Sequence, residues 1–167
     1  MSVLRTDRLV LRRFTAADVP LLVELDSDPD VIRYADPEYL AAPPTEDQER
    51  ATLSHILTGY EHGHEFWAAE EDDEGRFIGW FFLRPDDAGE WELGYRLRRA
   101  AWGRGLATEG ARAVVDHGFE TLGLELIYAE AVTANTASIN VLEKLGFSYV
   151  SSSVWLGMPD RRYELRP

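Results

Sequence analysis

The spacing of apolar and polar residues divides the chain into short strands and amphipathic helices. Apolar runs bounded by turn residues predict strands at 9–14, 65–70, 76–83, 91–97, 126–132, 147–155 and 161–165. Apolar residues at helical spacing predict helices over 15–25, 45–60, 105–121 and 136–145. The first two helices begin at Thr15 and Thr45, each with a residue three positions later that completes a capping box. This order predicts an α/β protein with a mixed central sheet and helices on both faces, in one domain spanning 1–167.

Turn residues set the predicted connections between these elements. The acidic segment 71–75 is predicted to form a hairpin turn, with a solvated tip favoured over a cation site, and a second turn is predicted at 86–89. Pro159 and Asp160 are predicted to turn the chain between the last two strands. His117, on the long helix over 105–121, is expected to face solvent.

The segment 102–109 carries the strongest chemical signal, because two glycines flank Arg104 between a predicted strand and a predicted helix. Gly103 and Gly105 permit a tight turn and let a ligand approach closely, since glycine has no Cβ. The helix start adds N–H groups without intrahelical acceptors and the positive end of the helix dipole. The turn therefore predicts a phosphate or pyrophosphate site.

Composition narrows the function further. The 167 residues are 45% hydrophobic, which is enough for a folded core, and the chain contains no cysteine, which excludes disulfides and cysteine nucleophiles. No apolar run approaches the roughly 20 residues of a membrane span and no signal-like block follows the start, so we expect a cytoplasmic protein without a membrane partner. His55, His62 and His64 lie without the carboxylate or further ligand of a metal site, so no metal is expected.

The net charge is −13, which argues against nucleic acid as a partner because phosphate binding needs a basic surface. The same charge fits a cationic substrate such as an amine, although solubility alone also explains it.

Several sequence blocks resemble the GNAT family of N-acetyltransferases, and within it the ribosomal-protein N-terminal acetyltransferase (RimJ/RimL-like) branch. The blocks are LRTDRLVLR at 4–12, ELGY at 92–95, WGRGLATEG at 102–110 and NTASINVLEKLGF at 135–147. They cover nearly the whole chain in the order of the family. The resemblance implies the acyl-CoA N-acyltransferase fold with a mostly antiparallel sheet, acetyl-CoA as co-substrate, and a primary amine as acceptor.

The resemblance also assigns the CoA site. In the family pattern Gln/Arg-x-x-Gly-x-Gly/Ala, Gly105 and Ala107 match the last two fixed positions, and Trp102 stands at the first. Arg104 either adds charge at the pyrophosphate or is an exposed turn side chain, and Asn135 both holds the pantetheine arm and caps a helix. The residues expected to bind the co-substrate are Leu97, Trp102, Gly103, Arg104, Gly105, Leu106, Ala107, Thr108, Asn135 and Ser138.

Acetyl transfer to an amine needs a base, a donor that polarises the carbonyl, and an acid for the leaving thiolate. Glu92 is the candidate base, with a purely structural role as the alternative, and a backbone N–H near residues 95–97 is the expected polarising donor. The usual acid, a tyrosine seven residues after the asparagine, is replaced here by Leu142. Ser138 is the candidate acid, with a hydrogen bond to CoA or to the helix backbone as the alternative. Tyr163 is a second choice for this acid.

The missing tyrosine leaves a second function open, that of a catalytically silent acyl-CoA-binding sensor or interaction domain. The sequence does not choose the acceptor amine or the length of the acyl group. It also leaves open whether two copies associate as a homodimer.

Overall fold

The fold is built on one sheet of eight strands, seen in the computed structural model, which describes residues 3–71 and 75–167. The strands are β1 (Leu4–Arg5), β2 (Leu9–Arg12), β3 (Glu65–Glu71), β4 (Arg76–Pro85), β5 (Trp91–Leu97), β6 (Ile127–Val132), β7 (Ser148–Trp155) and β8 (Met158–Leu165). The α-helices are α1 (Val19–Asp26), α2 (Pro29–Ile32), α3 (Glu46–Gly59), α4 (Leu106–Glu120) and α5 (Thr136–Leu145). Single 3-10 turns lie at Ala16–Asp18, Pro37–Leu40, Tyr60–His62 and Arg99–Ala101.

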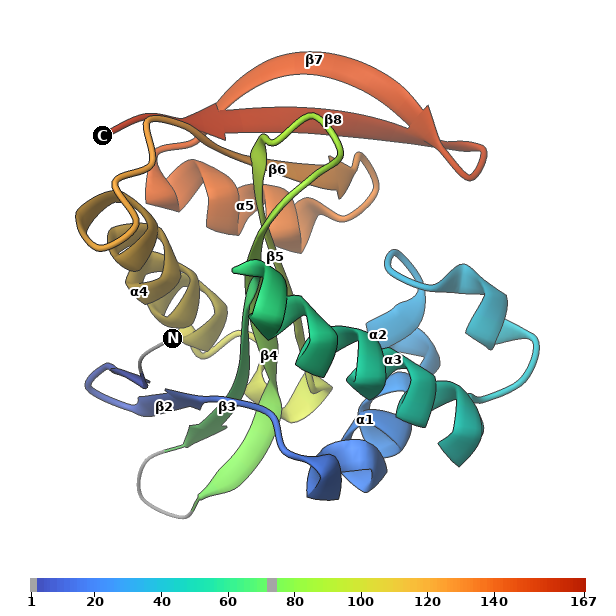
Figure 1. Ribbon diagram of the computed structural model, residues 1–167. Coiled ribbons are helices and arrows are strands. Elements are labelled where there is room, and N and C mark those ends of the chain that lie inside the picture. The colour runs from blue at the N-terminus through green and yellow to red at the C-terminus, as the bar shows by residue number, and fades with distance from the viewer. Residues whose placement is uncertain (1–2, 72–74) are drawn as a thin grey trace.

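The strand order is β1-β2-β3-β4-β5-β6-β8-β7, and every neighbouring pair is antiparallel except β5 and β6. Helices α4 and α5 lie on one side of β4 and β5, and α1 and α3 lie on the other (Figure 1). The predicted mixed sheet with helices on both faces is therefore confirmed. Successive side chains of β3 point to opposite faces of the sheet, so the hydrophobic core has two parts. Trp67 packs in the cluster that contains residues of α4, and Phe66 packs in the cluster that contains residues of α1 and α3.

The predicted capping boxes are confirmed at both helix starts. The backbone N–H of Thr15 donates to Asp18 Oδ2 at 2.7 Å, and the backbone N–H of Thr45 donates to Gln48 Oε1 at 2.8 Å. These bonds satisfy donors that a helix start otherwise leaves free. Gly146 ends α5 in a left-handed conformation with φ of 95°, as its position after the helix predicts.

The turn predicted at Pro159 and Asp160 was placed wrongly. The chain turns at Leu156 and Gly157, which both have positive φ, and β8 begins at Met158. Pro159 instead pairs with Val154 in the ladder between β7 and β8. Asp72, Asp73 and Glu74 of the predicted acidic turn lie outside the described residues.

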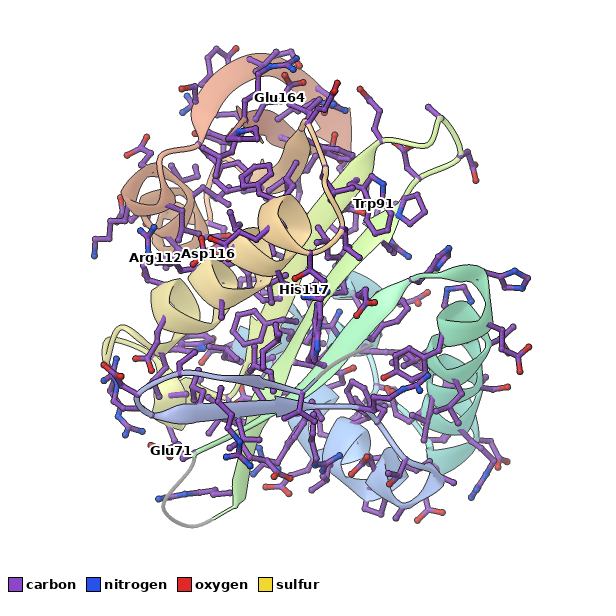
Figure 2. The ribbon with its side chains drawn as sticks, turned by 60° about the vertical axis from the view of Figure 1, so that its left-hand side comes forward. Glu71, Trp91, Arg112, Asp116, His117 and Glu164 are labelled. Carbon is purple, nitrogen blue, oxygen red and sulfur yellow. The ribbon has the colours of Figure 1, made fainter. Side chains whose placement is uncertain are left out.

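The expectation that His117 faces solvent is wrong. Its side chain points from α4 toward the sheet (Figure 2), and the residue is 6% exposed. The imidazole packs edge-on against Trp67, with ring centroids 5.5 Å apart, and its Nε2 lies 3.8 Å from Glu65 Oε2. Burial lowers the pKa of His117 and raises the pKa of Glu65, so both groups are shifted toward their neutral forms. His117 lies seven residues after Gly110, on the buried stripe of α4.

Candidate active site

A cavity of about 1120 Å³ opens where β5 and β6 separate. These parallel strands pair only through Trp91 with Ile127 and Glu92 with Tyr128. Beyond this point, residues 93–97 of β5 and 129–132 of β6 line the cavity from opposite sides. The first turns of α4 and α5 form one part of its wall, and residues of α1, α2 and α3 form another. The separation of two parallel strands thus makes a site that reaches both faces of the sheet.

The glycine turn forms the α4 side of this cavity. Gly103 and Gly105 have φ of 69° and 79°, in the left-handed region where a Cβ is disfavoured. Gly105 caps the start of α4, so the first N–H groups of the helix lie at the cavity wall. The indole Nε1 of Trp102 donates to the carbonyl of Leu97 at 2.8 Å and ties the turn to the end of β5.

Thr6 and Arg8, in the first of the sequence blocks that resemble the family, hold this turn in place. Thr6 Oγ1 donates to Glu109 Oε1 at 2.6 Å, and the Arg8 side chain donates both to Glu109 and to the carbonyl of Arg104. Burial opposes ionisation of Glu109, but the hydrogen bonds from Thr6 and Arg8 outweigh it and lower its pKa. The Arg104 side chain forms an ion pair with Glu71 and is not part of the cavity lining.

Glu92 lies on β5 at the last residue pair before β5 and β6 separate, and it lines the cavity. Its Oε2 is 3.2 Å from Arg84 Nη2, on the neighbouring strand β4, and its side chain is 21% exposed. Burial raises the pKa of Glu92, and Arg84 offsets only part of that effect. A carboxylate with a raised pKa is a better proton acceptor near neutral pH than an ordinary glutamate.

Asn135 and Ser138 lie together at the start of α5. The side chain of Asn135 accepts a hydrogen bond from the backbone N–H of Ser138 at 3.2 Å, so the asparagine caps the helix. Ser138 Oγ is 3.0 Å from the hydroxyl of Tyr95 on β5, and all three residues line the cavity.

Tyr95 is a functional candidate that reasoning from the sequence missed. Burial raises its pKa to about 12, so its hydroxyl stays protonated at neutral pH and can donate to Ser138. The only sequence signal was its place in the ELGY block. Leu142, at the position of the usual tyrosine, is buried in the core, and so is Tyr163.

The other end of the cavity is acidic and aromatic. Asp26, Asp36 and Glu38 line it together with Phe66 and Trp80. Arg96, also in the lining, forms ion pairs with Asp26 at 2.6 Å and with Asp36, and thereby fastens α1 and the 3-10 turn over 37–40 to β5. Burial opposes the charge of this arginine, but the two carboxylates outweigh the burial and raise its pKa.

No cluster of three or more histidine, cysteine, aspartate or glutamate residues that could hold a metal ion occurs within residues 3–71 and 75–167. Over the same residues, none of the helices is long and apolar enough to cross a membrane.

A family model described as an acetyltransferase (GNAT) domain matches residues 8–148. The chain belongs to the GNAT family of acetyltransferases. The uncharacterized N-acetyltransferase p20 of Bacillus licheniformis is 33% identical over 152 residues, which are 88% of this chain and 83% of p20. The FsC-acetyl coenzyme A-N(2)-transacetylase of Aspergillus fumigatus is 32% identical over 161 residues, which are 89% of this chain and 66% of that protein.

Among solved structures, the ribosomal L7/L12 α-N-protein acetyltransferase RimL in complex with coenzyme A has the same fold. Its TM-score is 0.85 at 15% identity, covering 99% of this chain and 98% of RimL. The GNAT fold and acetyl-CoA as co-substrate, both expected from the sequence, are thereby confirmed, and the likeness to RimL, a member of the branch expected from the sequence, is one of fold. This GNAT chain is an acetyl-CoA-dependent N-acetyltransferase.

Proposed function

We propose that this GNAT enzyme transfers the acetyl group of acetyl-CoA to a primary amine by direct attack in a ternary complex. The observation that carries the proposal is the place of Glu92, which lines the cavity where β5 and β6 separate and has a raised pKa. A protonated amine cannot attack a thioester, because its lone pair is occupied. Glu92 accepts that proton, directly or through one water, and the amine nitrogen then attacks the carbonyl carbon.

The co-substrate lies against the glycine turn in this proposal. The backbone N–H groups from Gly103 to Ala107 bind the pyrophosphate, with Trp102, Leu106 and Thr108 alongside them in the cavity wall. The ion pair of Arg104 with Glu71 favours a structural role for that side chain over direct phosphate binding. Leu97 and Asn135 border the pantetheine arm from β5 and α5, and backbone N–H groups near residues 95–97 polarise the thioester carbonyl.

The leaving thiolate receives its proton from Ser138, assisted by Tyr95. As the carbon–sulfur bond breaks, the electron pair stays on sulfur and the thiolate takes the hydroxyl proton of Ser138, while Ser138 Oγ recovers a proton from the attacking nitrogen, which loses its second N–H proton to become the neutral amide. A hydrogen bond from Tyr95 to Ser138 Oγ directs the serine proton toward the cavity and stabilises the developing alkoxide. This hydroxyl pair takes the place of the tyrosine that Leu142 replaces.

We expect Ser138→Ala and Tyr95→Phe each to lower kcat while leaving the Kd for CoA unchanged. Tyr95→Phe should cost up to about tenfold, because one net hydrogen bond is worth roughly 0.5–1.5 kcal/mol. If the two hydroxyls act together, the double variant loses little more than Ser138→Ala alone. Steady-state kinetics on the two single variants and the double variant complete this double-mutant cycle, and CoA titrations of each variant are the control. Strictly additive losses would separate the two roles, and full activity of Ser138→Ala would remove serine as the acid.

The acceptor amine is cationic before reaction in this proposal. The cavity lining has more carboxylates than basic side chains even though Arg96 pairs with Asp26 and Asp36, and this excess and the net charge of −13 both favour such a substrate. RimL acts on a protein α-amine and the Aspergillus fumigatus relative on an FsC nitrogen, as their names state, so peptide N-termini and small-molecule amines both belong in a screen.

The proposed function is tested by measuring release of free CoA thiol with a panel of amines. The panel contains peptide N-termini, amino acids, polyamines and aminoglycosides, with matched neutral and anionic compounds as controls. We expect acceptor-dependent thiol release with cationic amines, and an acceptor KM that rises with ionic strength. CoA binding without thiol release for any amine would instead indicate the catalytically silent sensor.

A further inference from the structure

Glu49 is a fully buried carboxyl group on α3 that the proposed chemistry does not use. It is 0% exposed and lies on the same side of the helix as Leu53 and Ile56, which pack in a cluster with residues of α1. A glutamate is almost never buried this completely unless it is paired. Within the described part of the chain, no N–H group is in hydrogen-bond geometry with either of its carboxyl oxygens. Burial without such a donor favours the uncharged form of this group.

Glu49 faces a second buried carboxyl group, that of Asp26 on α1. Asp26 is 2% exposed; burial has the largest effect on its pKa and raises it, and a hydrogen bond with Glu49 is among the effects that lower it. Its Oδ2 accepts from Arg96 at 2.6 Å, whereas no N–H group of the described residues reaches its Oδ1. Two carboxyl groups this close together are stable when they share one proton. The pair is therefore satisfied if Glu49 carries that proton and donates it to Asp26.

The charges around this pair also favour a protonated Glu49. The titratable and charged groups that face it from neighbouring elements are those of Asp26, Arg96, Asp36 and Tyr39. The tyrosine stays neutral, because burial and the nearby carboxylates raise its pKa. One guanidinium thus faces two carboxylates, and a third carboxylate would have no counter-charge. Burial accordingly raises the pKa of Glu49 to about 7, and repulsion from Asp26 adds to this effect.

Asp26 connects the buried proton to the cavity. Asp26, Arg96 and Asp36 line the cavity, whereas Glu49 is not part of its lining. Arg96 lies in the middle of the β5 segment whose backbone N–H groups are proposed to polarise the thioester carbonyl. Its two ion pairs hold α1 and the turn over 37–40 against that strand. Glu49 therefore acts on the acidic end of the cavity through Asp26, without touching a substrate.

We propose that Glu49 is a positioning residue for the acceptor amine: its protonated carboxyl group donates to Asp26 and so holds Arg96 in place. The inference rests on the proposed function, because it takes the acceptor to bind at the acidic end of the cavity. When Glu49 releases its proton to solvent, the hydrogen bond is lost and two adjacent buried carboxylates repel one another. We expect α1 and α3 then to move apart and affinity for the acceptor to fall, while the glycine turn at α4 keeps its affinity for CoA.

The shared proton is tested without any acceptor, by the Tm of wild type, Glu49→Gln and Glu46→Gln between about pH 5 and pH 7. A carboxyl group with a raised pKa binds its proton more tightly in the folded than in the unfolded chain. Its contribution to stability is therefore largest at low pH and is lost as the pH rises to about 7. Glutamine keeps a donor toward Asp26 and does not titrate, so Glu49→Gln should lack this part of the fall in Tm. Glu46→Gln is the matched control and should follow the wild type, because Glu46 lies on the same helix with its side chain 70% exposed.

The positioning role is tested by acceptor kinetics, with Glu49→Leu as the variant that fills the space and offers no donor. At about pH 6, Glu49→Leu should raise the acceptor KM by about tenfold or more, because it leaves a buried Asp26 oxygen unpaired, while kcat and the Kd for CoA change by less than about twofold. Glu49→Gln should keep the wild-type KM at this pH. Above about pH 7, the wild-type KM should rise relative to that of Glu49→Gln by up to about tenfold per pH unit, the limit for one linked proton. Ionisation of the amine cancels in this ratio, because both enzymes are measured with the same acceptor.

Two results would overturn the inference. One is a Tm profile of Glu49→Gln that matches that of Glu46→Gln, and the other is a folded Glu49→Leu that keeps the wild-type acceptor KM. Either result would leave the proposed function standing. A panel in which no amine releases thiol would contradict the proposed function and with it the positioning role, and the Tm profiles would still decide whether Glu49 holds the proton.

Discussion

Replacing Glu92 by glutamine is expected to lower kcat/KM by about 10²–10³, the usual size of a general-base contribution. Glutamine keeps the shape of the side chain and removes its basicity. The Kd for CoA should be unchanged, because the substitution does not touch the glycine turn, and the fold should be retained. The rate constants are measured by thiol release with the best acceptor from the amine panel, at several pH values.

The pH profile makes this prediction specific. The pKa of Glu92 is raised above its ordinary value, so wild-type kcat/KM should fall as the pH drops through that raised pKa. The variant should not show this decrease in kcat/KM at low pH, because glutamine does not titrate. The loss should shrink at high pH, where more of the acceptor is already deprotonated. Glu130→Gln is the matched control, since Glu130 also lines the cavity but from β6. Near-full activity of Glu92→Gln at neutral pH would leave Glu92 with a structural role alone.

Gly105→Val is expected to weaken CoA binding by at least about 100-fold. The residue has φ of 79°, which a β-branched side chain disfavours, so valine forces the turn to change. Displacing two N–H groups from the pyrophosphate costs about 1.5–3 kcal/mol for each charge-assisted hydrogen bond, which gives a loss of this size. Calorimetric titration with CoA measures the change.

Gly89→Val controls for backbone strain. Gly89 has φ of 82° and open space around its Cβ position, and it lies in the turn between β4 and β5 rather than in the cavity lining. Both variants should lose similar stability, but only Gly105→Val should lose CoA. Unchanged CoA affinity in folded Gly105→Val would contradict the pyrophosphate assignment.

Local signals in the sequence were sufficient to predict most of the fold. The capping pairs at Thr15 and Thr45 and the glycine after α5 act within a few residues, and the structure shows all three where they were predicted. The strand β1 and the helix α2 were missed. They have only two and four residues, which is too short for a repeating pattern of apolar and polar residues to be recognised. The last hairpin was misplaced because proline and aspartate are stronger turn signals than Leu156.

The details of the site depend on contacts between distant residues. Tyr95 and Ser138 are 43 residues apart and meet only because the fold brings the start of α5 close to β5. The partner of Arg84 could not be read from the sequence without the register of β4 and β5. His117 was assigned to solvent because its polarity was weighed above its place on the buried stripe of α4. Sequence motifs thus indicate the residue types of a site, while its hydrogen-bond partners follow from tertiary packing.

The most direct test of the central claim, one-step attack by the amine, is the time course of thiol release after rapid mixing of enzyme with acetyl-CoA. Without an acceptor, the account predicts no burst, because the chain has no cysteine and its cavity hydroxyls act as proton donors rather than nucleophiles. Adding the amine should start release, and initial rates at varied concentrations of both substrates should give intersecting lines. A burst of one thiol per enzyme without acceptor, with parallel lines, would show an acetyl-enzyme intermediate and contradict the account.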